Sequence, residues 1–252
     1  MFNLQDRVAI VTGGNGGIGL GMARGLARAG ARIVIAARDA TKGREAVAEL
    51  QALGTEARFC STDVTDEAAV AALVQTAADA FGSVDILVNN AGTNIRKQPQ
   101  EYSLAEWRHL VDTNLTSMFL CSKAVYPRMK QAGGGKIINI ASMMSIFGSP
   151  FAAPYAATKG GVVQLTRSLA IAWAPNNIQV NAILPGWIDT ELTRAARREI
   201  AGFEERIVAR TPAGRWGVIE DLADIAVFLA GAASDFVTGA AIPVDGGYSI
   251  QG

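Results

Sequence analysis

Residues 8–20 read VAIVTGGNGGIGL: a short run of apolar, mostly β-branched residues, a glycine-rich turn, and the start of a segment with helical spacing. Gly14-x-Gly16-x-x-Gly19 satisfies the dinucleotide-binding fingerprint, and the spacing Gly13-x-x-x-Gly17-x-Gly19 is an equally good interpretation of the loop. Glycines let a backbone approach an anion closely, and the N-terminus of the following helix favours negative charge. The stretch therefore predicts a strand, turn and helix that bind the phosphates of a dinucleotide. A tight turn without a ligand is the alternative.

Short apolar runs and alanine-rich segments continue to alternate along the chain. The apolar runs predict seven strands, at residues 7–11, 32–36, 57–60, 84–88, 136–140, 178–183 and 241–244. The segments between them predict helices at residues 18–29, 41–53, 66–81, 103–131 and 155–173. Continuous apolar runs indicate strands covered on both faces, and repeated strand–helix–strand units predict right-handed crossovers. We therefore expect an α/β, doubly wound Rossmann fold with a seven-stranded, mostly parallel sheet, forming a single domain over residues 1–252.

Residues 186–235 depart from this alternation, with helical fragments and no clear strand. Because the run 193–198 is polar and rich in arginine, we expect a small helical lid over one end of the sheet, at about residues 187–218. The glycines at 133–135 are too few for a linker, and they predict a helix C-cap followed by a turn into the next strand.

Composition excludes several classes of protein. Of 252 residues, 50% are hydrophobic, and 23 basic residues balance 23 acidic ones, so neither a disordered chain nor a nucleic-acid binder is expected. With Cys60, Cys121 and a single histidine, His109, the chain cannot build the usual zinc site, and we expect no metal. His109 itself is expected at the surface or at an interface. The chain shows neither a signal peptide nor an apolar stretch of about 18–20 residues, which predicts a cytoplasmic protein without a membrane span.

The end of the second predicted strand bears on the choice of dinucleotide. An acidic residue about 20 positions beyond the fingerprint normally holds the ribose 2′-hydroxyl of NAD. Here Ala37 and Arg38 occupy that place, with Asp39 just beyond, and an arginine can pair with a 2′-phosphate. The sequence therefore favours NADP(H), while NAD(H) stays open because the glycine loop has Asn15 and no basic residue. Arg38 as a solvated loop residue is the alternative.

Seven motifs follow one another in the order typical of one enzyme family. They are Thr12–Gly19, Asp63-Val64, Asn89-Asn90-Ala91-Gly92, Asn114, Ser142, Tyr155-x-x-x-Lys159 and Pro185-Gly186-x-x-x-Thr190. Over essentially its whole length the chain resembles the short-chain dehydrogenase/reductase family. Within the family, residues 94–97, 138–143 and 212–217 look most similar to sugar-acid dehydrogenases of the gluconate 5-dehydrogenase and 2-deoxy-gluconate 3-dehydrogenase type. The oxoacyl-carrier-protein reductases are the nearest alternative.

The expected catalytic residues combine physical argument with this resemblance. Tyr155 and Lys159 lie four residues apart on a predicted helix, so their side chains are neighbours. A nearby ammonium lowers a tyrosine pKa from about 10 towards neutrality, which suits a general acid–base. Ser142, just past the fifth predicted strand, is expected to hydrogen-bond the reacting oxygen. The resemblance implies that Lys159 also holds the nicotinamide ribose and that Asn114 positions a water in a proton relay.

The resemblance also implies the cofactor contacts. Asp63 and Val64 are expected to hold the adenine, Asn90 the adenosine ribose, and Ile188 with Thr190 the carboxamide. The motif at 89–92 is expected to tie the sheet together as well. The full expected set is Gly13, Asn15, Gly16, Gly17, Ile18, Gly19, Arg38, Asp63, Val64, Asn90, Ala91, Gly92, Tyr155, Lys159, Pro185, Gly186, Ile188 and Thr190.

For the substrate we expect a pocket near Asn94, Arg96, Met144 and Trp187. Arg96 can pair bidentately with a carboxylate, or it is simply a solvated loop charge. The predicted function is an NAD(P)(H)-dependent oxidoreductase for a secondary alcohol or ketone, such as a sugar acid or polyol. A 3-oxoacyl-carrier-protein-type ketoreductase and a non-catalytic dinucleotide sensor are the alternatives.

The expected partners are a small-molecule substrate and further copies of this chain. The resemblance implies a homo-tetramer, and the predicted helices at 103–131 and 155–173 carry apolar residues on more than one face. In the second of these helices the apolar residues are Val162, Val163, Leu165, Leu169 and Ile171.

Overall fold

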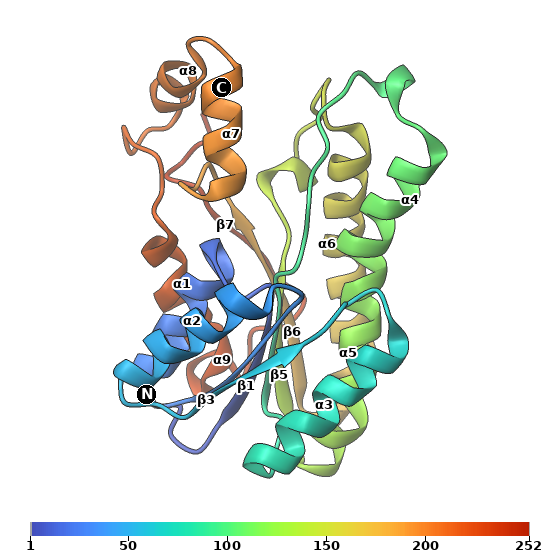
Figure 1. Ribbon diagram of the computed structural model, residues 1–252, viewed down its shortest axis with the longest axis vertical. Coiled ribbons are helices and arrows are strands. Elements are labelled where there is room, and N and C mark those ends of the chain that lie inside the picture. Colours follow the sequence, from blue (N-terminus) through green and yellow to red (C-terminus); the bar gives the residue numbers. More distant parts are fainter. Residues whose placement is uncertain (1, 252) are drawn as a thin grey trace.

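In the computed structural model, which describes residues 2–251, seven strands form one sheet in the order β3-β2-β1-β4-β5-β6-β7 (Figure 1). The strands are β1 (Val8–Thr12), β2 (Arg32–Ala37), β3 (Ala57–Ser61), β4 (Ile86–Asn89), β5 (Gly135–Ile140), β6 (Ile178–Pro185) and β7 (Ala241–Val244). Every neighbouring pair is parallel. The expected strands are therefore confirmed, with ends that shift by two residues or fewer.

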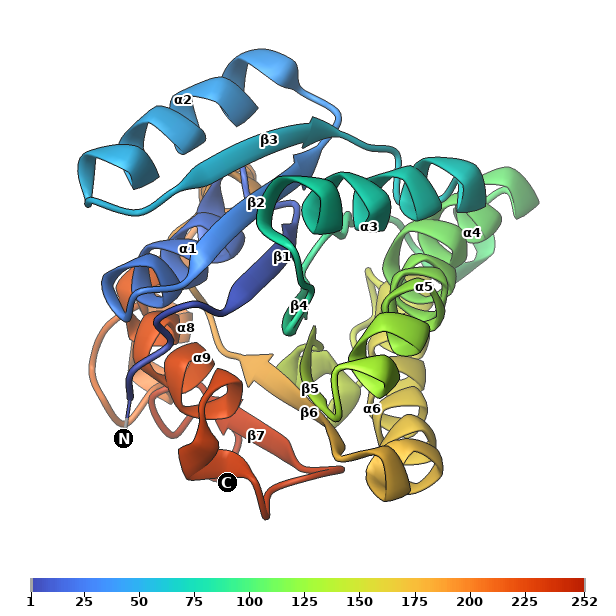
Figure 2. The ribbon, with the colours of Figure 1, turned by 90° about the horizontal axis from the view of Figure 1, so that it is seen from below.

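Helices cover both faces of the sheet (Figure 2). One face carries α1 (Gly17–Arg28), α2 (Ala40–Ala52) and α9 (Ala223–Ala230), and the other carries α3 (Glu67–Phe81), α5 (Ser117–Gln131) and α6 (Ala153–Trp173). The central strands β1 and β6 are buried along their whole length, as expected for continuous apolar runs between two helical layers. The doubly wound fold predicted from the alternation of segments is thus confirmed.

The helix expected over residues 103–131 is wrong as a single helix. A π-helical turn at Asp112–Thr116 separates α4 (Leu104–Val111) from α5. Asn114, in that turn, is fully buried: its Oδ1 accepts a hydrogen bond from Thr93 N at 2.8 Å, and its Nδ2 donates to Thr93 O at 2.9 Å. π turns of this kind are frequent at functional sites. These hydrogen bonds join residues distant in sequence, so helical periodicity alone does not reveal the turn.

The expected lid region contains two short helices. These are α7 (Glu191–Glu199) and α8 (Phe203–Arg210), and both stand beyond the carboxyl end of the sheet (Figure 1). The last helical fragment of the irregular region, α9, is instead part of the sheet-covering layer and packs against α1. Along residues 2–251, no helix combines the length and apolar content that crossing a bilayer requires.

Candidate active site

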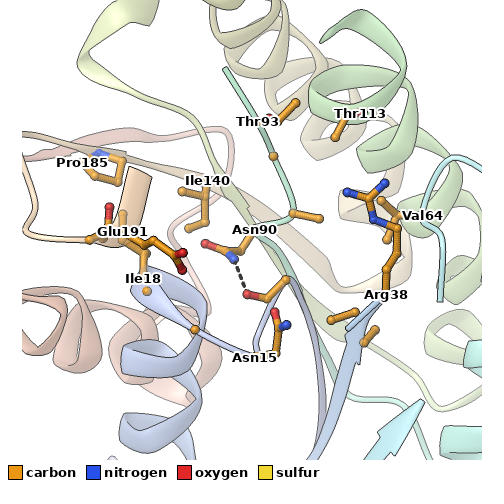
Figure 3. Close-up of a pocket in the computed structure, with 18 of the residues that line it drawn as sticks. Asn15, Ile18, Arg38, Val64, Asn90, Thr93, Thr113, Ile140, Pro185 and Glu191 are labelled. Atoms are coloured by element: carbon orange, nitrogen blue, oxygen red, sulfur yellow. Dashed lines mark hydrogen bonds between the residues drawn. The ribbon is translucent and has the colours of Figure 1, made fainter. Parts of the chain in front are cut away.

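A cavity of about 780 Å³ opens at the carboxyl ends of the central strands. β1 and β4 are parallel neighbours there, and the order of the strands reverses between them: β2 and β3 lie on one side of β1, and β4 to β7 lie on the other. Open α/β sheets bind ligands at such a switch point. Figure 3 shows part of the lining. The expected residues that line the cavity are Gly13, Asn15, Gly16, Gly17, Ile18, Arg38, Asp63, Val64, Asn90, Ala91, Gly92, Ser142, Tyr155, Lys159, Pro185, Gly186, Ile188 and Thr190. Gly19 and Asn114 lie just behind this lining.

The glycine loop is held against β4 by Asn90. The Asn90 Nδ2 donates to Thr12 O at 3.0 Å and to Gly13 O at 3.1 Å. A Cβ added at Gly19 would lie 2.5 Å from both Asn90 Nδ2 and Gly13 O, so the turn is this tight only with glycine there. Helix α1 starts beyond Gly16 with no side-chain cap and no acidic residue in its first turn. Its N-terminus therefore offers positive partial charge to an anion in the cavity.

Asn89, the neighbour of Asn90, supports the sheet, as expected for the 89–92 motif. Its buried Nδ2 donates to Ser122 Oγ on α5 at 3.0 Å and to Asn139 Oδ1 on β5 at 2.9 Å. The motif therefore joins the glycine loop, β4, β5 and α5 at one place.

The end of the cavity beside β2 and β3 carries charge. Hydrogen bonds from Thr65 lower the pKa of Asp63, and the charges of Arg38 and His109 act in the same direction. Arg38 forms no ion pair with the side chains that the structure describes, which are those of residues 2–251 apart from 192, 195, 196 and 199. His109 is exposed, as expected, but it also lines the cavity, together with Thr113. The sequence signal was available, because His109 lies a few residues before Asn114 on the segment that approaches the site.

Tyr155 and Lys159 project from α6 towards Ser142, which follows β5. Lys159 Nζ donates to Ile140 O at 2.7 Å and lies 5.6 Å from the centre of the Tyr155 ring. Ser142 Oγ accepts from Met144 N at 3.1 Å, which fixes the direction of the hydroxyl. The structure therefore brings three of the four expected catalytic residues together on one wall of the cavity.

The fourth, Asn114, holds backbone instead of facing the cavity. The oxygen and the nitrogen of its amide group both form hydrogen bonds with the backbone of Thr93. These bonds fix the course of the backbone just after Gly92, in the segment that follows β4. A Cβ at Gly92 would lie 3.2 Å from Asn114 Oδ1 and 3.8 Å from Lys159 Nζ. Asn114, Gly92 and Lys159 are therefore packed as one unit.

The electrostatics differ from the expectation that Lys159 brings the Tyr155 pKa near neutrality. Burial raises the pKa of Tyr155 above its ordinary value, while the contact with Ser142 and the charge of Arg96 act to lower it. Burial also lowers the pKa of Lys159 to about 8. Desolvation disfavours both charged forms. In the site without cofactor, burial therefore opposes ionisation of both groups, and a Tyr155 pKa near neutrality with Lys159 and an oxidised nicotinamide both in place stays a prediction.

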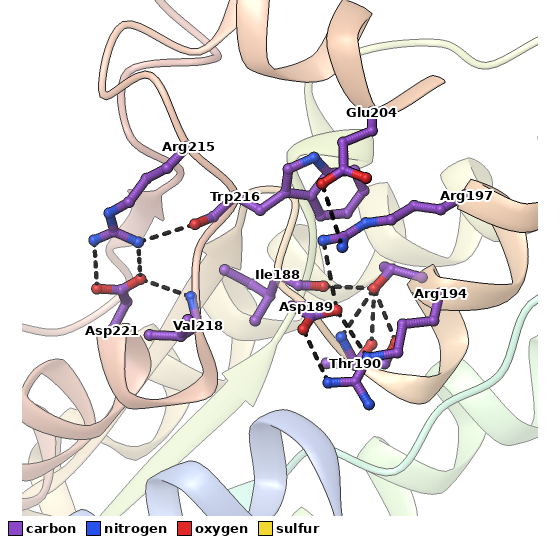
Figure 4. Close-up of polar contacts among 11 residues, drawn as sticks. Ile188, Asp189, Thr190, Arg194, Arg197, Glu204, Arg215, Trp216, Val218 and Asp221 are labelled. Atoms are coloured by element: carbon purple, nitrogen blue, oxygen red, sulfur yellow. Dashed lines mark hydrogen bonds and ion pairs between the residues drawn. The ribbon is translucent and has the colours of Figure 1, made fainter. Parts of the chain in front are cut away.

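At the opposite end of the cavity, the backbone after β6 is ordered by Thr193, which sequence reasoning missed. Thr193 Oγ1 donates to Ile188 O at 2.6 Å and accepts from Thr190 N at 3.0 Å (Figure 4). A Cβ at Gly186 would lie 2.6 Å from Asp245 Cα, so only glycine fits at this point. The spacing Thr190-x-x-Thr193 at a helix start was the available signal.

None of the four expected substrate residues lines the cavity, within the described residues. Met144 and Trp187 lie instead in an aromatic cluster beneath the lid, where the Trp187 ring packs edge-on against Phe203 at 5.0 Å and Trp216 at 5.6 Å. The charge of Arg96 acts to lower the pKa of Tyr155.

Lid and aromatic cluster are joined by Arg197 of α7. Its guanidinium lies 3.7 Å from the centre of the Trp216 ring and pairs with Asp189 at 3.4 Å and Glu204 at 3.6 Å (Figure 4). The lid is therefore tied to the chain that leaves β6.

Comparison with known proteins places this arrangement in a family. The family described as enoyl-(acyl carrier protein) reductase matches residues 13–249. The 2-dehydro-3-deoxy-D-gluconate 5-dehydrogenase of Dickeya dadantii is 45% identical over 248 residues, which are 98% of this chain and 97% of that protein. The chain belongs to the short-chain dehydrogenase/reductase family. Gluconate 5-dehydrogenase of Gluconobacter oxydans is 41% identical over 253 residues, 100% of this chain and 98% of its own.

A solved structure of the family agrees with the fold. Gluconate 5-dehydrogenase from Burkholderia cenocepacia, in complex with NADP and tartrate, superposes with a TM-score of 0.94 at 43% identity, covering 99% of this chain and 97% of that one. The resemblance inferred from the seven motifs is thereby confirmed. So is the reaction class, an NAD(P)-dependent oxidoreductase acting on a CH–OH group.

Proposed function

We propose that this protein is an NADP(H)-dependent dehydrogenase that interconverts a secondary alcohol and a ketone on a small sugar acid. One observation carries the proposal: Ser142, Tyr155 and Lys159 line the same cavity as the glycine loop. The proton donor Tyr155 and the expected dinucleotide site therefore lie in the same cavity. The names of the relatives, which are gluconate-type dehydrogenases, support the substrate class.

The residues present fit a nicotinamide dinucleotide. The uncapped start of α1 suits the pyrophosphate, and Gly92 and Lys159 line the same cavity. Arg38, without an ion pair in the described chain, suits the 2′-phosphate, and the NADP complex of the Burkholderia relative supports this choice over NAD(H). When bound, the nicotinamide supplies the hydride donor or acceptor.

The protein's own residues then manage the proton and the developing charge. Tyr155 donates a proton to the carbonyl oxygen in reduction and removes the alcohol proton in oxidation. Because burial raises the pKa of Tyr155, its hydroxyl is protonated in the free site, which is the state that reduction needs. Ser142 stabilises negative charge on the same oxygen. Lys159, as an ammonium, favours the tyrosinate needed in oxidation, and it would also hold the nicotinamide ribose of a bound cofactor.

Substrate recognition is assigned to Arg96, with Asn94, Met144 and Trp187 forming the adjoining wall. The charge of Arg96 acts on Tyr155, so a carboxylate paired with Arg96 would hold the neighbouring carbons near the acid. The side-chain oxygen of Asn94 is buried without a hydrogen-bond partner in residues 2–251, and a substrate hydroxyl would satisfy it. Helices α7 and α8 act as the lid that excludes water from this space.

The experiment is a substrate panel read by absorbance of the reduced nicotinamide. Keto and hydroxy sugar acids, matched neutral polyols and acetoacetyl thioesters are compared for the unaltered protein and for Arg96→Ala. We expect sugar acids to be preferred and Arg96→Ala to raise KM for them alone. If the protein prefers the thioester and Arg96→Ala leaves KM unchanged, the oxoacyl reductase function is established instead. Binding of NADPH without turnover of any class would indicate a dinucleotide sensor.

We also propose a cytoplasmic homo-tetramer. The large apolar side chains exposed on α4, α5 and α6 include Leu104 (62% exposed), Phe119 (44%) and Ile171 (80%). By contrast, Val162 and Leu169 are buried within the subunit, so only part of the apolar surface of α6 is available to a partner. Light scattering after size-exclusion chromatography tests this, and a monomer would refute it.

A further inference from the structure

An ion pair crosses the mouth of the cavity between two elements far apart in sequence. Lys42 Nζ, in the first turn of α2, lies 3.0 Å from Glu191 Oε2, at the first residue of α7. Both side chains also line the cavity, and they are 52% and 88% exposed. The pair therefore joins the dinucleotide half of the molecule to the lid.

Glu191 is the unexpected member of this pair. Its neighbour Thr190 has its Cγ2 atom 3.5 Å from where a Cβ on Gly17 would lie, so α7 begins directly against the glycine loop. Figure 3 shows the Glu191 side chain at the rim of the cavity, beside the start of α1. A carboxylate at this place repels the phosphates that the loop is built to hold, unless a cation neutralises it. Lys42 provides that cation.

We propose that Lys42 is a ligand for a phosphate of the bound cofactor, and that Lys42 is paired with Glu191 until the cofactor binds. The inference rests on the proposed NADP(H) specificity. Arg38 lies four residues before Lys42 and directly precedes the Asp39 cap of α2, so both cations project from the same end of α2. The glycine loop has the uncharged Asn15 at its tip, so Lys42 is the second cation on this side of the cavity.

Exchange of partners is physically feasible because the pair is exposed. Exposed ion pairs are weak, whereas a phosphate carries more charge than a carboxylate and binds lysine well as a point charge. The hydrogen bond to Glu191 raises the pKa of Lys42, and the charges of Asp39 and Glu45 act in the same direction. The charges of Asp39 and Glu45 remain when Glu191 is displaced, and they continue to favour the protonated form of Lys42.

The test is direct binding, read by fluorescence titration with NADPH and with NADH. Lys42→Met is expected to weaken binding about fivefold, the upper range for an exposed pair. Glu191→Gln is expected to tighten binding by a similar factor, because it frees Lys42, and the effects of the two substitutions are not expected to add, because the ion pair couples the two residues. Lys123→Met is the matched control, since Lys123 forms a 2.9 Å exposed pair with Glu67 far from the cavity.

The two cofactors distinguish the phosphates. Loss confined to NADPH assigns Lys42 to the 2′-phosphate, and equal loss with NADH assigns it to the pyrophosphate. Weaker cofactor binding in Glu191→Gln would show that the ion pair between Lys42 and Glu191 persists over the bound cofactor, and this result would overturn the proposal. Unchanged affinity in Lys42→Met would overturn it as well. If the unaltered protein binds neither dinucleotide, the proposed function itself fails.

Discussion

Replacing Lys159 with methionine is expected to change how the free energy of unfolding depends on pH. The side chain is 3% exposed, and burial lowers its pKa from 10.5 to about 8. The unfolded chain, with the ordinary value, therefore binds more protons than the native protein between about pH 8 and 10.5. The buried charge destabilises the native state fully below pH 8, and this destabilisation disappears as the pH rises to 10.5.

The difference between 10.5 and about 8 corresponds to about 3 kcal/mol of destabilisation at neutral pH. Methionine removes this charge but also removes the 2.7 Å hydrogen bond from Nζ to Ile140 O, which stabilises by about 1 kcal/mol at every pH. Lys159→Met is therefore expected to be about 2 kcal/mol more stable than the unaltered protein near neutrality. Near pH 10.5 it becomes slightly less stable.

Urea unfolding at fixed protein concentration, from about pH 7 to about pH 10, measures this difference. Fixed concentration is needed because assembly of subunits would add to the apparent stability. Lys123→Met, at an exposed site on α5, is the control and should show no comparable dependence on pH. A stability difference between Lys159→Met and the unaltered protein that stays constant over this range would refute the reasoning.

The remaining predictions concern catalysis and cofactor binding. Tyr155→Phe should lower kcat by about 10²–10⁴-fold with NADPH affinity unchanged, because it removes the proton donor and little volume; a variant that keeps half of kcat would contradict the assignment. Ala37→Asp combined with Arg38→Leu should shift kcat/KM from NADP towards NAD, and an unaltered protein that already prefers NAD would refute the cofactor choice. Gly19→Ala should weaken dinucleotide binding in titrations, because the added Cβ would meet Asn90 Nδ2 and Gly13 O at 2.5 Å; unchanged affinity would show that the turn can adjust.

Much of the fold could be predicted because its signals are local. Each strand is a short apolar run, and β1 and β6 are buried on both faces as such runs require. The glycine loop follows from spacing alone. The π turn at Asp112–Thr116 could not be predicted, because it depends on hydrogen bonds between Asn114 and the backbone of Thr93. The role of α9 as a sheet-covering helix likewise depends on its contact with α1.

The candidate site divides in the same way. Motifs identify most of the residues that meet in the cavity, because five of the seven motifs follow the carboxyl end of a strand, and Tyr155 and Lys159 reach the same place from α6. Three further residues line the cavity without belonging to a motif: Lys42, Glu191 and Thr193. They could not be predicted, because sequence spacing does not show in which direction their side chains point.

The charge states are the part of the site that residue spacing does not give, and the cause is burial. Spacing places Lys159 beside Tyr155 and suggests that the ammonium alone lowers the tyrosine pKa. The fold buries both groups, and burial disfavours tyrosinate and ammonium together, so the pKa of Tyr155 rises while that of Lys159 falls to about 8. Oxidation of an alcohol therefore has to overcome this effect of burial on Tyr155. Arg96 already acts in this sense, and for that reason we expect a substrate that pairs with Arg96 to affect proton transfer as well as binding.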